Sequence, residues 1–95
     1  MTHISVTIKL SPEEIIERAV RYFGPTGLGL VVLEQGPHYV LLDGGGGHVE
    51  IITRPLLKAT AVEFAPEEWE EKVKEFIETL PRLAGKTLSF NRSLT

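Results

Sequence analysis

The sequence predicts an α+β domain built on a twisted antiparallel sheet of about five strands, with both helices on one face. Three observations favour this class. Short segments alternate apolar and polar residues, two longer segments repeat apolar residues at helical spacing, and four strand-like segments follow one another closely. Consecutive strands with short connections are antiparallel neighbours, so the expected element order is β-α-β-β-β-β-α.

The first strand is expected at residues 3–10, where every second residue is apolar: Ile4, Val6, Ile8 and Leu10. Residues 11–14, Ser-Pro-Glu-Glu, form a capping box with proline at the first helical position, which predicts the start of a helix. Gly24 is expected to end this helix in a left-handed conformation, and Pro25 prevents its continuation.

Four further strands are expected at residues 28–35, 38–43, 48–54 and 58–64. Gly36-Pro37 turns the chain between the first two, and Pro55 breaks pairing after the third. The four glycines at 44–47 are interpreted as a flexible hairpin tip that needs positive φ. A phosphate-binding loop would instead require a following helix and a Lys-Ser or Lys-Thr pair.

A second helix is expected to open at Pro66-Glu67-Glu68, because acidic residues in the first turn complement the helix dipole. One face of this helix carries apolar residues: Trp69, Val73, Phe76, Ile77 and Leu80. A common core is expected to bury Ile8, Phe23, Leu42, Ile51, Trp69 and Phe76. We expect a single domain over residues 1–84 and a loosely ordered C-terminal tail over residues 85–95.

Composition narrows the classes of function. The chain has no cysteine, which excludes disulfides, thiolate catalysis and cysteine-ligated metal sites. The net charge of −3 disfavours nucleic acid as a partner, since phosphate binding requires a basic surface. The longest apolar stretch, residues 28–33, is far shorter than the ~20 residues of a membrane span. The N-terminus has no signal-peptide pattern, so we expect a cytoplasmic protein with no membrane partner.

The element order resembles a reduced helix-grip domain, the architecture of START/Bet v1-like ligand binders and polyketide cyclases. Residues 4–14, Ile-Ser-Val-Thr-Ile-Lys-Leu-Ser-Pro-Glu-Glu, look like the opening strand and helix entry of that family, and residues 65–80, beginning Ala-Pro-Glu-Glu-Trp, look like its closing helix. The usual fold has more strands and a longer closing helix, so the resemblance implies at most a shallow cavity. The same order also resembles one half of a TATA-box-binding-type saddle, whose open sheet face grips DNA.

The glycine hairpin brings three polar residues together. Pairing Asp43 with His48 across the loop places Glu50 on the same face, within side-chain reach of both. A carboxylate–imidazole–carboxylate set could bind a divalent metal or act as an acid–base pair. A flexible tip lacks the preorganisation that either role needs, so we interpret these residues as a solvated polar rim. No metal and no cofactor are expected.

Within residues 28–35, alternation places Leu28, Leu30 and Val32 on one face and Val31 and Leu33 on the other. Together with the hairpin register, this leaves apolar residues on the sheet face that the helices do not cover: Val31, Leu33, Tyr39, Leu41 and Ile52. Unless the sheet coils strongly and the tail covers them, such a patch marks an interface.

No residue combination forms a complete reaction centre. We therefore expect a small non-catalytic binding or assembly module, homodimeric through this face. The alternative is a small-molecule binder, or a cyclase- or isomerase-like enzyme, with a shallow cavity between the sheet and the last helix. Its apolar ligand would contact Tyr39, Leu41, Ile52 and Trp69.

Overall fold

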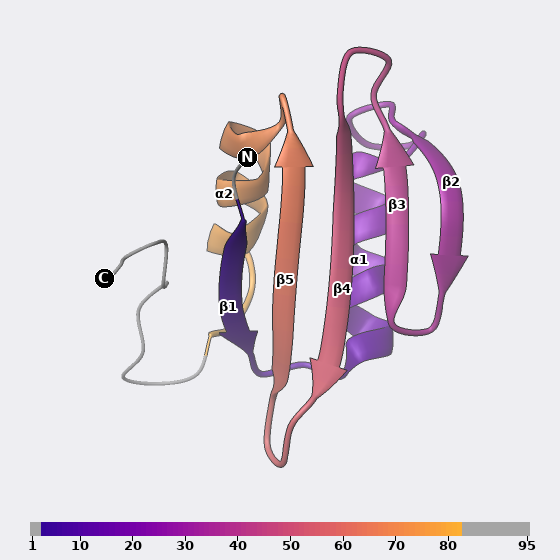
Figure 1. Cartoon of the computed structure of the whole chain (residues 1–95). Coiled ribbons are helices and arrows are strands. Elements are labelled where there is room, and N and C mark those ends of the chain that lie inside the picture. Colours follow the sequence, from indigo (N-terminus) through magenta and orange to yellow (C-terminus); the bar gives the residue numbers. More distant parts are fainter. Residues whose placement is uncertain (1–2, 83–95) are drawn as a thin grey trace.

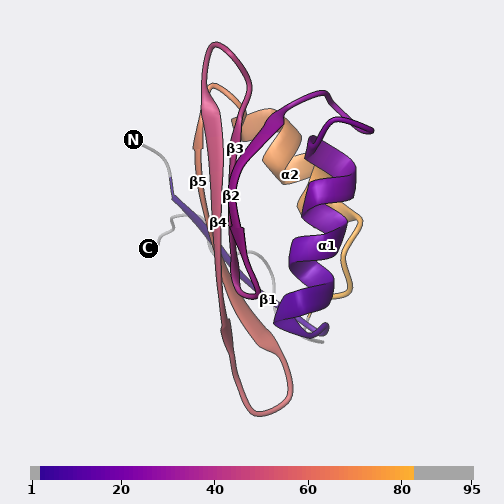
Figure 2. The ribbon, with the colours of Figure 1, turned by 90° about the vertical axis from the view of Figure 1, so that its right-hand side faces the viewer.

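The computed structural model describes residues 3–82, and their element order is the predicted β-α-β-β-β-β-α. The strands and helices are β1 (Ile4–Ile8), α1 (Pro12–Phe23), β2 (Val31–Gly36), β3 (Tyr39–Asp43), β4 (His48–Pro55), β5 (Thr60–Glu67) and α2 (Glu70–Glu78). The strands form one antiparallel sheet in the order β1-β5-β4-β3-β2, and both helices pack on the same side of it (Figures 1 and 2). The predicted fold class is confirmed. The tail expected at 85–95 lies outside the described residues.

The start of α1 has the serine cap of the predicted capping box, while the Glu14 carboxylate contacts Arg18, and the end of the helix differs from the prediction. The Ser11 hydroxyl accepts a hydrogen bond from the Glu14 backbone N–H at 3.2 Å, and Pro12 is the first helical residue. The left-handed cap predicted at Gly24 is wrong, because this residue is extended with φ −74°. Glycine is needed there for space instead, since a Cβ atom would overlap the carbonyl oxygen of Val20.

Strand β2 begins three residues later than predicted and contains a bulge. The residues before it form a turn, and the register with β3 shifts between Val32 and Glu34. Leu33 is the extra residue, so the regular alternation that places Val31 and Leu33 on one face does not continue to Glu34, which pairs with Leu41. Val31 pairs with Asp43 and therefore lies on the same sheet face as that residue. A bulge at an edge strand interrupts the row of backbone groups that another strand could pair with.

The boundary between β5 and α2 also differs from the prediction. β5 continues to Glu67, and Pro66 is buried opposite Val49 of β4 instead of opening a helix. The alternation of β5 explains this, because Pro66 follows Phe64 on the buried face. Glu68 then adopts a positive φ of 71°, and α2 begins at Glu70.

The core lies between the sheet and the two helices. Helix α1 packs against β3 and β4, and α2 packs against β5. The rings of Phe23 and Phe64 each meet the ring of Phe76, with centroids 5.3 and 6.1 Å away. Five predicted core residues are fully or almost fully buried: Ile8, Phe23, Leu42, Ile51 and Phe76. The sixth, Trp69, is only half-buried, because it precedes α2 and packs at the margin of the core.

Candidate functional site

The sheet face opposite the helices, here called the open face, carries a short apolar strip. Strands β3 and β4 pair Tyr39 with Ile52 and Leu41 with Glu50, which is the register predicted from the glycine hairpin. Tyr39, Leu41 and Ile52 therefore lie beside one another on two adjacent strands in the interior of the sheet. The side chain of Ile52 is 45% exposed, and those of Tyr39 and Leu41 are partly exposed. We refer to these three residues as the apolar strip.

Carboxylates surround the apolar strip on the open face. Register and alternation place five of them on this face: Glu34, Asp43, Glu50, Glu63 and Glu67. The basic side chains that accompany them there are Arg54 and two histidines, His3 and His48. The open face is thus an apolar centre with a predominantly acidic margin.

The polar set predicted at the glycine hairpin has a different geometry from the one expected. Asp43 and His48 are opposite each other, as predicted, and Glu50 lies on the same face. The carboxylate that approaches the imidazole, however, belongs to β5: His48 Nδ1 lies 3.1 Å from Glu67 Oε1. Among residues 3–82, no group of three or more His, Cys, Asp and Glu side chains is placed to hold a metal ion.

Sequence reasoning missed the carboxylates that β5 contributes. The strand was expected to end at residue 64, so Glu67 was assigned to a helix. The sequence carried a partial signal, because the larger apolar residues Val62, Phe64 and Pro66 alternate with Glu63, Ala65 and Glu67. Burial along the strand alternates up to Glu67. On the same face, Glu63 Oε2 lies 2.8 Å from His3 Nδ1 at the β1 edge.

Tyr39 connects the apolar strip to the acidic margin. Its hydroxyl donates a hydrogen bond to Glu34 Oε1 at 3.2 Å. Desolvation raises the pKa of this hydroxyl, and the hydrogen bond to Glu34 and the charges of Glu34 and Glu50 raise it further. The phenol therefore remains a hydrogen-bond donor at the edge of the strip at neutral pH.

Trp69 does not join Tyr39, Leu41 and Ile52. It packs against the core, and its indole lies so close to Gly44 that a Cβ atom there would overlap the ring. A Cβ atom at Gly47 would overlap the carbonyl oxygen of Glu67, and the Gly44 N–H donates to the Gly47 carbonyl at 2.8 Å. The predicted positive φ occurs at Gly45, at 85°. The loop is therefore glycine-rich partly because other chain segments approach it closely, while its flexibility stays a prediction.

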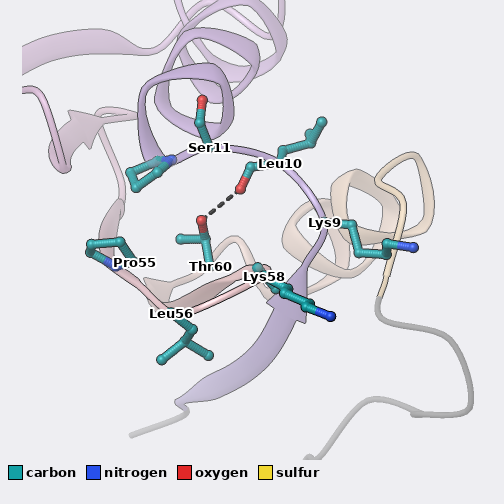
Figure 3. A pocket seen from close by; sticks show the side chains of 9 residues that line it. Lys9, Leu10, Ser11, Pro55, Leu56, Lys58 and Thr60 are labelled. Carbon is teal, nitrogen blue, oxygen red and sulfur yellow. Dashed lines mark hydrogen bonds between the residues drawn. The ribbon is translucent and has the colours of Figure 1, made fainter.

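Two shallow pockets lie beside α1, away from the predicted cavity. One, of about 340 Å³, lies between the start of α1 and the connection from β4 to β5, and is lined by Lys9, Leu10, Ser11, Pro12, Pro55, Leu56, Lys58, Ala59 and Thr60 (Figure 3). The other, of about 250 Å³, lies between α1 and the turn from β2 to β3. Where α2 meets the sheet, buried side chains that include Phe64 and Phe76 fill the interface.

Three comparisons with known proteins found no match to this chain. No protein-family model matches the chain, and neither a curated protein nor a solved structure matches it. The helix-grip resemblance therefore stays a hypothesis about the order of elements. Within residues 3–82, neither helix has the length and apolar character needed to cross a bilayer.

Proposed function

We propose that the protein is a non-catalytic binding module that forms a homodimer through its open face. The observation that carries this proposal is the apolar strip: Tyr39, Leu41 and Ile52 adjoin on central strands and remain in contact with water in a single copy. A two-fold axis would bury the same strip on both copies. A specific interface of this kind covers ~800 Å² per partner.

The acidic margin gives such a dimer a distinctive dependence on salt. Face-to-face association brings five carboxylates of one copy towards the same five of the other. Like charges oppose association, and salt screens exposed charges over a Debye length of about 10 Å at 0.1 M. The homodimer should therefore become tighter as the salt concentration rises.

The same carboxylates favour a second candidate, a heterologous partner that presents apolar and basic side chains. Electrostatic complementarity would then accelerate association and favour this partner over others. Binding of that kind should weaken as salt rises, which is the opposite of the behaviour expected for the homodimer.

Leu41→Asp tests the proposal. Leu41 is partly exposed on the open face, so an aspartate there leaves the core intact but places an unpaired charge in the middle of the interface. The dissociation constant of the dimer should rise at least ~30-fold, as expected for an interface hot spot. Leu57→Asp is the matched control, because Leu57 is 95% exposed at another part of the molecule.

Sedimentation equilibrium or light scattering across a salt series reads out the result. A wild-type dimer that tightens with salt, is lost in Leu41→Asp and persists in Leu57→Asp supports the homodimer. Wild-type monomer at high micromolar concentration overturns it. The second candidate then requires that a peptide of alternating lysine and leucine bind the wild type more tightly than Leu41→Asp, and more weakly at high salt.

A further inference from the structure

The connection between β4 and β5 carries two exposed leucines. It projects beyond the other strands at its end of the sheet (Figures 1 and 2). Leu57 is 95% exposed and Leu56 is also exposed, although leucine is a residue that proteins usually bury. A backbone hydrogen bond of 2.8 Å from the Leu56 N–H to the Ala59 carbonyl closes the hairpin. We refer to residues 55–59 as the leucine hairpin.

Four basic residues lie at this end of the sheet, three at the base of the leucine hairpin and one, Lys58, within it. Strand pairing aligns Pro55 and Thr60 with Ile8, and Ile8 forms a bridge with Arg82. Pro55, Thr60, Ile8 and Arg82 therefore form one row across the sheet. Each of the four basic residues belongs to this row or lies within two chain positions of one of its members: Lys9, Arg54, Lys58 and Arg82. Arg54 and Lys58 belong to one hairpin, and the folded sheet brings Lys9 and Arg82 to the same end from two other segments of the chain.

These cations lack acidic partners. None of the four forms an ion pair with another residue of the range 3–82. The acidic residues at the nearby start of α1 are directed elsewhere, since Glu13 approaches His38 and Glu14 approaches Arg18. The sequence contains no Asp or Glu after Glu78. This end of the molecule is therefore positive although the chain as a whole has a net charge of −3.

Two hydrogen bonds connect separate chain segments at the leucine-hairpin end of the sheet. The Thr60 hydroxyl donates to the Leu10 carbonyl at 2.6 Å across the pocket of Figure 3, and the Lys9 N–H donates to the Pro81 carbonyl at 2.7 Å. The side chains of Lys9 and Lys58 extend on the same side of that pocket (Figure 3). The leucine hairpin and the cations at its base thus form a defined surface.

We propose that this end of the molecule docks on an anionic membrane surface. Exposed leucines beside a group of cations match the two layers of such a surface, since apolar side chains enter the headgroup–acyl boundary while Lys and Arg contact anionic headgroups. The phosphates of a nucleic acid would attract the cations but offer the leucines no apolar environment. This proposal departs from the expectation of no membrane partner, which rested on the absence of a spanning segment. A surface contact requires no such segment, so it is compatible with the absence of membrane-crossing helices among the described residues.

Vesicle co-sedimentation tests the proposal. The wild-type protein should bind phosphatidylcholine vesicles that contain phosphatidylserine, bind vesicles of phosphatidylcholine alone far more weakly, and dissociate as salt rises. Each cation contributes about fivefold to binding, so Lys9→Gln combined with Lys58→Gln should weaken binding roughly 25-fold. Leu57→Ser should weaken it about tenfold or more, since leucine burial is lost. Leu57 is almost fully exposed, so this change should leave folding intact.

Matched variants control for charge and for exposed apolar surface. Arg18→Gln combined with Arg21→Gln removes the same charge from α1, and Leu33→Ser removes an exposed leucine from the β2 edge. Both should bind like the wild type. Because the chain has no cysteine, Leu57→Cys with a polarity-sensitive dye should report an apolar environment on vesicles, while Leu33→Cys should not.

Three results would overturn the proposal: no binding to the phosphatidylserine vesicles at low salt, equal binding to both vesicle types, or binding that Leu57→Ser leaves unchanged. Retention on immobilised polyglutamate through Lys9 and Lys58, without binding to vesicles, would also reject the membrane and assign this end to an acidic protein partner.

Discussion

The two faces of the sheet are built from the same strands but have opposite environments. Ile51 and Ile52 are consecutive in β4, yet Ile51 is fully buried beneath the helices while Ile52 is 45% exposed. On the covered face the neighbours are mostly aliphatic and aromatic side chains, whereas on the open face they include five carboxylates. Hydrophobicity alone therefore does not determine the role of a residue here. The position of the helices makes one isoleucine part of the core and leaves the other exposed on the open face.

The largest expected effect on folding stability comes from placing one carboxylate on each sheet face in turn. Ile51→Asp would bury an unpaired carboxylate, which costs several kcal/mol of the ~5–15 kcal/mol that stabilise a domain. The protein should fail to fold cooperatively. Ile52→Asp places the same charge in contact with water, and a cooperative thermal transition monitored by circular dichroism should persist.

The difference in folding between Ile51→Asp and Ile52→Asp tests the assignment of the two sheet faces. A cooperatively melting Ile51→Asp protein, or an Ile52→Asp protein without a transition, would show that the two faces are assigned the wrong way round. The dependence of melting on protein concentration should be measured in the wild type, because the proposed dimerisation would also contribute to apparent stability.

An effect of intermediate size on the free energy of unfolding is expected in the glycine loop, because the Trp69 indole lies against Gly44. Gly44→Ala would place a methyl group in the indole ring, and overpacking of this kind costs about 1–3 kcal/mol. Gly46→Ala meets no atom within 4 Å and should change stability by no more than about 1 kcal/mol. Urea unfolding of both variants measures the difference, and equal stabilities would contradict the proximity of Trp69 to Gly44.

The smallest effect concerns the ionisation of Tyr39 on the open face. Glu34→Gln removes one of the charges that raise the pKa of this hydroxyl, so the pKa should fall towards the ordinary value of 10.0. Partial burial and Glu50 remain, and they should keep the pKa raised. Absorbance titration in a Tyr22→Phe background isolates Tyr39, since the chain has two tyrosines. A pKa that is unchanged by Glu34→Gln would show that the contact is absent in solution.

Much of the fold and part of the candidate site could be predicted from the sequence. The alternation of residues 4–8 identified the first strand, and the capping box at residues 11–14 identified the start of α1. The glycine loop fixed the register that pairs Tyr39 with Ile52 and Asp43 with His48. These features depend on backbone periodicity and on turn geometry, which are set by residues close together in the chain.

The neighbours that come from distant segments depend on the folded sheet. The pairing of β4 with β5 brought Glu67 to His48, and the β2 bulge changed the alternation at Leu33. The bridge from Ile8 to Arg82 completed the basic end of the sheet. Lateral strand pairing and helix docking are determined by the burial of the whole core, and no periodicity within a single segment encodes them. Local sequence patterns therefore predict the order of the elements and one hairpin register, while the packing of the whole core sets which charges and apolar side chains come together on the surfaces of the sheet.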